Sequence, residues 1–394
     1  MDFSYSPEEE KFRQEVRAWL EANLPEGWGT PAFKAPSNEQ EEREFGRWWH
    51  QKMYEGGWVG IGWPKEYGGR GAGLMEQVVF HEEWARHRAP GALNNIGVGW
   101  AGPTIIAHGT EEQKKRFIPK ILSAEDIWCQ GFSEPEAGSD LASLRTRAVD
   151  KEDHFLINGQ KVWTTGGKDA DWGILMVRTD PDAPKHRGIS YLLINMHSPG
   201  VTVRPLRQIG GTAEFGEWFL DDVKVPKENL LGQLNAGWYI GMTTLAFERS
   251  GTASVARFTS LLHEMIALAK KTERYGRPAS KDPVIRQRLA QFAIEVEIMR
   301  YTGYRNLTTQ LRGGIPGPES SIGKLYWSEM NVRAADIPMQ ILGPYSLLGR
   351  RSQHSVDEGR WLYLFLRAPG DTIMEGTSEI QRNIIGERAL GLPR

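Results

Sequence analysis

The chain has 394 residues, of which 40% are hydrophobic and 25% are charged. A chain of this length is too long for one small domain, and we expect two or three domains packed together. The formal net charge is −2, so the basic excess that nucleic-acid-binding proteins usually carry is missing. No run of about eighteen apolar residues occurs, and no membrane span is predicted.

The few cysteines and histidines indicate the compartment and argue against a metal site. Cys129 is the single cysteine, so an internal disulfide is excluded and a buried structural thiol is expected. The acidic start of the chain lacks the features of a secretory signal, and we expect a cytoplasmic protein. His81, His87 and His108 lack metal-ligand spacing, and no metal is predicted.

The first third of the chain has the pattern of helices. Ser6, Pro7 and Glu9 form a capping-box start with proline at the first helical position. Apolar residues then recur at spacings of three and four on one helix face, namely Phe12, Val16, Trp19 and Leu20. After a glycine-rich interruption at Gly56–Gly73, helix-like sequence continues to about Ile121.

The pattern changes to short strands near Ile127. Asn158-Gly159 is typical of a tight turn, so Phe155–Ile157 and Lys161–Trp163 are predicted to form a hairpin. Turn residues at regular intervals separate further predicted strands, which are Trp172–Arg178, Ile189–Met196, Val201–Leu206 and Glu217–Val225. This pattern indicates a small all-β domain and not a βαβ series.

Helical periodicity returns after Gly232. Apolar residues from Val255 to Leu268 share one face, and Asp282-Pro283 is a cap for a second long helix. Further helices are predicted at about Ser320–Ile341 and Thr377–Leu390. The order of helices, strands and helices predicts an α+β multidomain fold with domains at 1–126, 127–234 and 235–394.

Two segments of the predicted β-domain carry residues suited to ligand chemistry. Gly131–Asp140 combines small residues, which allow a backbone to approach a ligand, with hydroxyls; the same composition is common in ordinary turns. Lys161–Gly167 places Trp163 before two threonines, and an indole there suits stacking on a flat heterocycle or plain core packing.

Two more such segments lie in the predicted helices. Leu245–Arg249 contains a Glu-Arg pair in an otherwise apolar helix, which is either a solvated pair or a functional one. Ile373–Arg382 contains a glycine turn that leads into a helix start, where free N–H groups can bind phosphate or simply be capped.

Together and in this order, these segments resemble the acyl-CoA dehydrogenase family, in its bacterial fatty-acyl and steroid-type branch. The resemblance covers essentially the whole chain and extends to family-like stretches at Trp63–Gly69, Gly109–Lys114, Phe219–Gly232 and Gln340–Gly343. It implies an N-terminal helical domain, a central β-domain and a C-terminal four-helix bundle. It also implies FAD between the last two domains, partly at a subunit interface.

The resemblance assigns roles to individual positions. Those that match flavin-ring contacts are Gln130, Phe132, Ser133, Trp163 and Thr165. Ser139 matches a position near the FAD pyrophosphate and the pantetheine arm of the substrate. Those that match contacts to the adenine half or the pyrophosphate are Gln340, Gly343, Thr377 and Glu379. Ser139, Arg249 and Gly376 are the expected substrate contacts.

The implied reaction is α,β-dehydrogenation of an acyl-CoA thioester to the trans-2-enoyl-CoA. A glutamate removes the α-proton, hydrogen bonds to the thioester carbonyl stabilise the enolate, and hydride passes from the β-carbon to flavin N5. The base is Glu375 in one branch of the family and Glu248 in another. Both positions are glutamates here, and the neighbouring residues favour Glu248 slightly.

Two positions depart from the family pattern. The family usually has an arginine three residues before an aromatic-Gly pair, and this arginine reaches FAD in the neighbouring subunit. Here the pair is Tyr275-Gly276 and the arginine is replaced by Thr272. Lys271 or Arg274 is a candidate substitute for it. Pro344 replaces a second glycine after Gln-x-x-Gly.

These departures leave alternatives open for assembly and activity. A homotetramer or homodimer that passes electrons to an electron-transferring flavoprotein is the default, and a heteromer is the alternative. A flavin oxidase or monooxygenase of the same fold, or a non-catalytic subunit that completes another chain's FAD site, also fits the sequence. The acyl group cannot be deduced.

Overall fold

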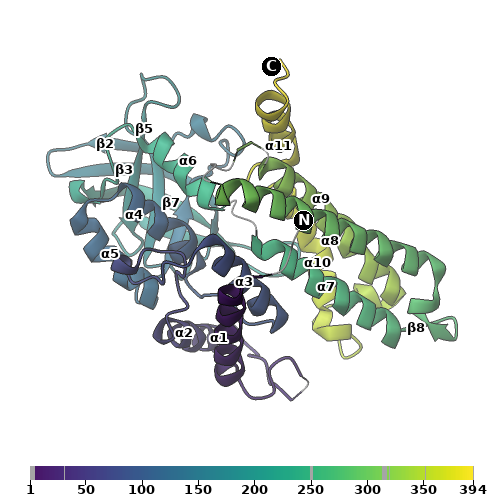
Figure 1. Cartoon of the computed structure of the whole chain (residues 1–394). Coiled ribbons are helices and arrows are strands. Elements are labelled where there is room, and N and C mark those ends of the chain that lie inside the picture. The colour runs from purple at the N-terminus through teal and green to yellow at the C-terminus, as the bar shows by residue number, and fades with distance from the viewer. Residues whose placement is uncertain are drawn as a thin grey trace. The chain divides into compact units, whose positions relative to one another are not determined.

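The computed structural model in Figure 1 describes residues 5–30, 32–248, 252–312, 317–318, 320–350 and 352–393. These residues form two compact units. The first unit comprises the N-terminal helices up to Gln77, the segment from His87 onward, the main sheet and helix α6 (Gly237–Glu248). The second unit comprises Val78–Arg86 and the helices after α6.

The helices of the first unit begin at side-chain caps. At α1 (Pro7–Asn23), the Ser6 hydroxyl accepts from the Glu9 N–H at 3.2 Å and the Glu9 carboxylate accepts from the Ser6 N–H at 2.7 Å, which is the predicted capping box. The other helices are α2 (Glu39–Glu55), α3 (Leu74–Arg86, which ends in the second unit), α4 (Gly102–His108) and α5 (Glu111–Ser123). Phe12, Val16 and Leu20 of α1 are buried, as their spacing predicts.

A seven-stranded sheet carries the candidate ligand segments. Its strands are β1 (Trp128–Gly131), β2 (Arg147–Asp150), β3 (His154–Thr165), β4 (Trp172–Arg178), β5 (Ile189–Asn195), β6 (Val201–Leu206) and β7 (Phe215–Pro226). They are ordered β1-β4-β2-β3-β7-β6, and β5 pairs with β4. The predicted β-domain is thus confirmed. Cys129 is fully buried in its core, and burial raises the pKa of the thiol.

The predicted hairpin at Asn158-Gly159 is wrong. The 12-residue strand β3 runs through both residues, because β7 pairs with it along its length. Ile157 pairs with Val223 and Gly159 pairs with Leu220, so a β-bulge occurs here and its extra residue lies on β7, opposite Asn158. The Asn158 side-chain amide donates to the Asp222 carboxylate at 2.8 Å, and its Oδ1 accepts from the Asp222 N–H at 3.0 Å, which holds the bulged part of β7 to β3.

A methyl group at Gly159 would collide with the backbone beside it. An added Cβ would lie 2.6 Å from Thr146 Oγ1 and 2.7 Å from Thr146 Cα. We expect Gly159→Ala to lower the free energy of unfolding by about 1–3 kcal/mol, as overpacked sites do. Chemical denaturation of the variant measures this loss. Gly91→Ala is the control, because nothing lies within 4 Å of an added Cβ there. An equal loss of unfolding free energy in both variants would contradict the expected collision with Thr146.

Helix α6 packs very closely on the sheet. A Cβ at Gly237 would lie 2.3 Å from the carbonyl carbon of Ser190, and one at Gly241 would lie 2.8 Å from the Met176 sulfur. The two glycines therefore let the helix backbone approach β5 and β4 more closely than any side chain would permit. Figure 1 shows α6 against the sheet, beside β5.

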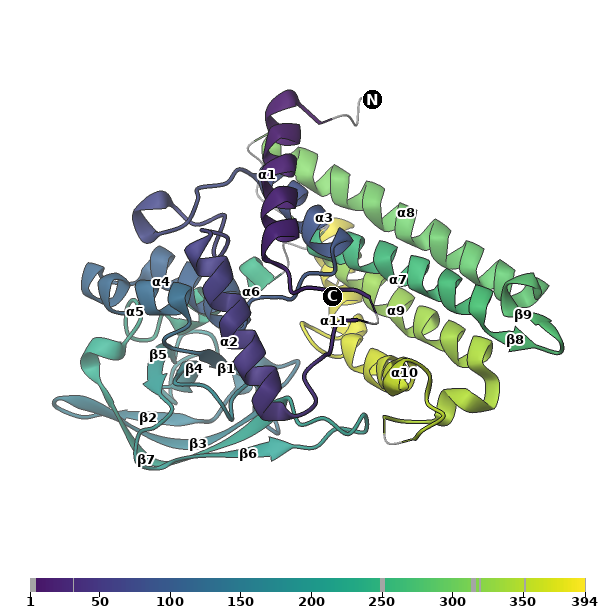
Figure 2. The same ribbon diagram turned by 90° about the horizontal axis from the view of Figure 1, so that it is seen from below.

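The second unit is a helical bundle (Figure 2). Its helices are α7 (Thr252–Lys271), α8 (Pro283–Leu311), α9 (Ser320–Leu342), α10 (Arg360–Asp371) and the short α11 (Ser378–Ile384). The Asp282 carboxylate accepts from the Val284 N–H at 2.9 Å and caps α8, as predicted. Phe258, Phe292, Met330 and Trp361 are buried in the core. The sequence analysis did not predict α10.

A small hairpin of β8 (Glu273–Arg274) and β9 (Arg277–Pro278) joins α7 to α8. Figures 1 and 2 both show this hairpin at one end of the bundle and α11 toward the other. The predicted last helix, at about Thr377–Leu390, is confirmed: Thr377 caps α11, which continues directly into a π-helical turn at Ile385–Ala389. Among the described helices, none has the length and apolar character needed to cross a membrane.

Candidate active site

The structure brings together the two segments that were predicted at the flavin ring. The Val162 N–H donates to the Ser133 carbonyl at 2.9 Å, and the Lys161 ammonium donates to the Phe132 carbonyl at 3.0 Å. The loop that follows β1 is thereby tied to the end of β3. Predicted contact residues on both segments, Gln130, Ser133 and Thr165, are half-buried at this junction.

Trp163 adopts an unusual backbone conformation at the end of β3. Its φ is 62°, and the pairing of β3 with β7 shifts register between Lys161 and Thr164. Positive φ is uncommon for a bulky residue, and such strain is frequent at ligand sites. The bulge leaves the indole 60% exposed, edge-on to Phe215 with the ring centroids 6.0 Å apart. An exposed flat ring held by a rigid strand is suited to stacking on a ligand.

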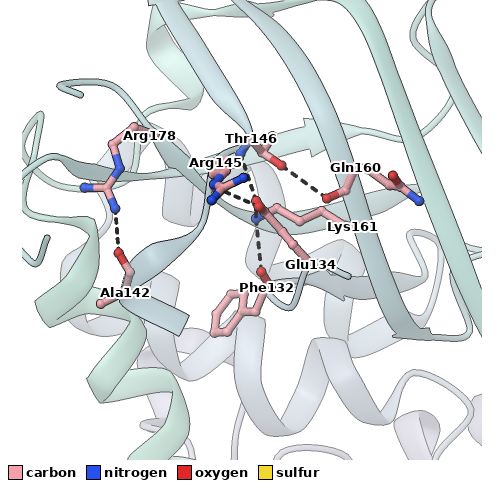
Figure 3. Close-up of polar contacts among 8 residues, drawn as sticks. All are labelled: Phe132, Glu134, Ala142, Arg145, Thr146, Gln160, Lys161 and Arg178. Carbon is pink, nitrogen blue, oxygen red and sulfur yellow. Dashed lines mark hydrogen bonds and ion pairs between the residues drawn. The ribbon is translucent and has the colours of Figure 1, made fainter. Parts of the chain in front are cut away.

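A buried ion pair supports this junction from inside the domain (Figure 3). The Lys161 side chain is fully buried, and its Nζ lies 2.8 Å from Glu134 Oε1. The Glu134 carboxylate also accepts from the Arg145 N–H at 2.7 Å and the Thr146 N–H at 2.9 Å. With the Phe132 carbonyl as a further acceptor for Lys161, both charges are hydrogen-bonded, which a buried ion pair requires.

The electrostatics of the pair follow from this geometry. Burial lowers the pKa of Lys161 to about 8, against the opposing effect of the Glu134 charge. Burial acts to raise the pKa of Glu134, but the Lys161 charge and the hydrogen bonds from Lys161, Thr146 and Arg145 outweigh it, so that this pKa is lowered. Both groups are therefore charged at neutral pH. The sequence analysis assigned neither residue a role, although a lysine inside an alternating strand is an unusual core residue.

Breaking this pair is expected to cost more than removing both of its charges. Lys161→Met leaves the Glu134 charge buried without its counter-ion, and we expect a loss of about 3–5 kcal/mol of unfolding free energy. The double variant Lys161→Met, Glu134→Gln should recover part of that loss, because no charge then remains buried. Denaturant titrations of the two variants make the comparison. A double variant that is less stable than Lys161→Met would contradict this view of the pair.

A chain of hydroxyls fixes the position of α6. The buried Thr244 Oγ1 lies 2.9 Å from Thr104 Oγ1 on α4 and 3.0 Å from the Tyr191 hydroxyl on β5. The neighbouring Thr243 hydroxyl lies 3.0 Å from His108 Nε2. Tyr191 also packs edge-on against the Phe132 ring, with the centroids 5.8 Å apart. Contacts from two other elements therefore set the rotation of α6 about its axis.

The candidate base Glu248 is the last residue of α6. It follows Thr244 by four residues, so both backbone positions lie on one face of the helix. The Glu248 side chain is not among those that the structure describes, and Arg249, the predicted substrate contact, lies outside the described residues.

The other candidate base, Glu375, lies on a turn between α10 and α11. Its φ is 58° and that of Gly376 is 84°, so two consecutive residues are left-handed. Thr377 caps α11, where its hydroxyl accepts from the Ile380 N–H at 3.2 Å. Hydrogen bonds from its own backbone and from the Thr377 hydroxyl lower the pKa of the exposed Glu379.

The remaining predicted FAD contacts of the bundle lie at two separate places. Gln340 lies in the last turn of α9 beside the β8–β9 hairpin, where its carbonyl accepts from Arg274 Nη1 at 2.8 Å, and Gly343 follows the helix with φ 57°. Thr377 and Glu379 instead belong to α11, which an Arg382–Glu329 ion pair ties to the middle of α9. At the α-helical rise per residue, Glu329 and Gln340 are about 16 Å apart along the axis.

Ser139 is the remaining predicted site residue of the first unit. Ser139 is exposed in the loop after β1, next to Asp140, whose carboxylate accepts from Lys185 at 2.7 Å. Of the two candidate substitutes for the missing arginine, Lys271 pairs with Asp357 at 3.1 Å, while Arg274 contacts the Gln340 segment. Arg274 is therefore the candidate that contacts a segment with predicted FAD contacts.

The sequence matches the domain models of one enzyme family over nearly its whole length. Residues 6–125 match the acyl-CoA dehydrogenase N-terminal domain, residues 129–223 match the middle domain and residues 235–390 match the C-terminal domain. The chain belongs to the acyl-CoA dehydrogenase family, whose members are oxidoreductases.

Known proteins resemble the chain over its whole length. Acyl-CoA dehydrogenase IpdE1 of Mycobacterium tuberculosis is 39% identical over 395 residues, which cover 98% of each chain, and IpdE1 of Mycolicibacterium smegmatis is 40% identical with the same coverage. The crystal structure of the ChsE4-ChsE5 complex from Mycobacterium tuberculosis matches with a TM-score of 0.84 at 33% identity, over 100% of both chains. The predicted fold class is thus confirmed.

Proposed function

We propose that the chain catalyses the FAD-dependent α,β-dehydrogenation of an acyl-CoA thioester. The observation that carries this proposal is the junction between the loop after β1 and the end of β3, where the predicted flavin-ring contacts meet on one rigid support. This junction is suited to binding a flat heterocycle with polar edges.

The residues at the junction fit a flavin by their chemistry. The Gln130 amide and the hydroxyls of Ser133 and Thr165 are half-buried donors and acceptors beside the exposed Trp163 ring. This set suits a planar ring with carbonyl and N–H edges. When bound, FAD supplies the hydride acceptor, and the chain's task is to bind, orient and deprotonate the thioester.

The chain's own residues perform the proton chemistry. A glutamate carboxylate accepts the α-proton of the thioester, and backbone N–H donors stabilise the charge that develops on the carbonyl oxygen. We infer that Glu248 is the base. Its support is the hydroxyl chain around Thr244, which fixes α6 one turn before Glu248. On the resemblance to the family, Glu375 then contributes the backbone of its turn.

Two glutamine variants separate the candidate bases. We expect Glu248→Gln to abolish bleaching of the flavin's visible absorbance in an anaerobic titration with acyl-CoA, because the amide cannot accept the α-proton. Glu375→Gln should retain bleaching at a reduced rate. Bleaching by Glu248→Gln combined with none by Glu375→Gln would reassign the base to Glu375. Bound flavin that no acyl-CoA bleaches would favour the oxidase alternative.

The substrate class is inferred from likeness alone. Another solved structure, titled as the Tcur3481-Tcur3483 steroid ACAD, matches with a TM-score of 0.84 at 32% identity over 100% of both chains. We therefore propose a steroid-derived acyl group as the first thioester to test, beside straight-chain and branched ones. Electron-transferring flavoprotein remains the proposed acceptor, on the resemblance to the family.

We further propose that a second, different chain completes the FAD site. Gln340 lies in the last turn of α9, whereas Thr377 caps α11, which is tied to the middle of α9, so one FAD molecule would meet the two residues more readily on two chains. Thr272 lacks the usual arginine, and a similar solved structure is a complex of two named chains. An exposed apolar stripe on α8, formed by Ile294, Ile298 and Tyr301, offers a surface for association.

A charge placed in the α8 stripe should disrupt the assembly. Ile298 is 46% exposed, and Ile298→Asp is expected to shift the assembly to smaller species and to lower its FAD content, because a desolvated carboxylate opposes association. Sedimentation and flavin absorbance measure the two effects. Ile209→Asp is the control, since that isoleucine is 81% exposed and lies on the β6–β7 loop. An unchanged size for Ile298→Asp would exclude this stripe as the interface.

A further inference from the structure

The turn that carries Glu375 and Gly376 is clamped at its beginning by a buried polar cluster. The Asp371 carboxylate, at the end of α10, accepts from Asn331 Nδ2 at 2.7 Å and from Arg367 Nη1 at 2.9 Å. The buried Lys324 ammonium donates to the Asp371 carbonyl at 3.0 Å. These contacts fix where the turn leaves α10.

One side chain, Gln381, holds the end of the same turn. It is fully buried on α11, and its Nε2 donates to the Glu375 carbonyl at 2.8 Å and to the Gly376 carbonyl at 3.3 Å. Both partners are acceptors only, so the amide must present its NH₂ group to them and its orientation is fixed. The two peptide planes that follow Glu375 are therefore both held by one side chain.

Two linked features require glycine at position 376. Its φ of 84° is a left-handed conformation, and an added Cβ would lie 2.8 Å from Gln381 Nε2. The close approach of the amide and the backbone conformation therefore depend on each other. Glu375, with φ 58°, shares the strained geometry, and such strain persists only where the surrounding structure enforces it.

The hydrogen bonds of Gln381 also set the direction of two backbone N–H groups on the opposite side of the turn. In a planar trans peptide the C=O and the N–H point in opposite directions. When Gln381 draws the carbonyls of Glu375 and Gly376 toward the buried interior, the N–H groups of Gly376 and Thr377 are turned the other way. The same constraint sets the direction in which the backbone presents Glu375.

We propose that Gln381 is a positioning residue for the dehydrogenation, which acts by fixing the peptide planes from Glu375 to Thr377. This inference rests on the proposed function, since it assigns the turn to the thioester site. Loss of the two hydrogen bonds should let the planes rotate, and a misplacement of about 1 Å at such a site can lower a rate by about 100-fold.

The test compares two glutamines that make the same kind of contact. Gln113 is also buried, and its Nε2 donates to the carbonyls of Glu228 and Leu230 at 2.8 and 2.9 Å, away from the turn. In the flavin-loaded assembly, Gln381→Met should slow the reduction of flavin by acyl-CoA by about 10- to 100-fold, with a much smaller change in the thioester concentration needed for half-saturation. Gln113→Met should leave that rate unchanged.

Amide hydrogen exchange tests the positioning without any substrate. Exchange in the segment 372–378 should be faster in Gln381→Met than in the wild type, and unchanged in Gln113→Met. Unchanged exchange in Gln381→Met would overturn the inference. Faster exchange with a wild-type rate of flavin reduction would also overturn it, because Gln381 would then be only structural.

A second variant keeps the size and shape of the side chain. Gln381→Glu donates to the Glu375 carbonyl only when its carboxyl is protonated, and burial raises the pKa of such a group. The rate should therefore be restored as pH falls and lost as pH rises through that pKa. A pH profile equal to that of the wild type would contradict positioning. If no acyl-CoA reduces the flavin of the wild-type assembly, the proposed function and the catalytic part of this inference are both overturned. That outcome does not depend on the hydrogen-exchange result.

Discussion

The buried pair of Lys161 and Glu134 is the interaction on which the candidate site depends. Two unpaired charges at this depth would be very unfavourable, so their hydrogen bonds hold the loop after β1, strand β3 and the backbone at Arg145–Thr146 in one arrangement. The Phe132 carbonyl is a second acceptor for Lys161. The predicted flavin contacts on both segments are therefore positioned by an ion pair that is itself buried.

The elements that begin at local side-chain caps were the easiest to predict from the sequence. Caps such as Ser6 and Asp282 act within a few residues, so their local pattern is sufficient. Asn158-Gly159 misled because a dipeptide that suits a turn can also lie inside a long strand, opposite a bulge of the partner strand, and only the pairing of β3 with the distant β7 decides between them. The ion pair itself joins residues 27 positions apart, a contact that no local spacing reveals.

The candidate site shows the same division between local and long-range information. Family resemblance predicted which segments contact the flavin ring, and the hydrogen bond from Val162 to Ser133 joins these segments. Resemblance could not tell that Gln340 lies in the last turn of α9 while Thr377 caps a helix tied to the middle of α9, nor that Gln381 holds the turn at Glu375 and Gly376. These are properties of helix packing, in which a side chain meets partners from other elements, and they determine how the two glutamates are supported.

The most direct test of the account follows both hydrogens of the substrate. An acyl-CoA that reduces the flavin of the loaded assembly would be prepared with deuterium at the α-carbon, at the β-carbon or at both. The account predicts a product that has lost one deuterium from each labelled carbon, and slower flavin reduction with either label, since a carboxylate takes one hydrogen as a proton and the flavin takes the other as hydride. A product that retains all of its α-deuterium, or a rate that is insensitive to the α label and the β label, would contradict it.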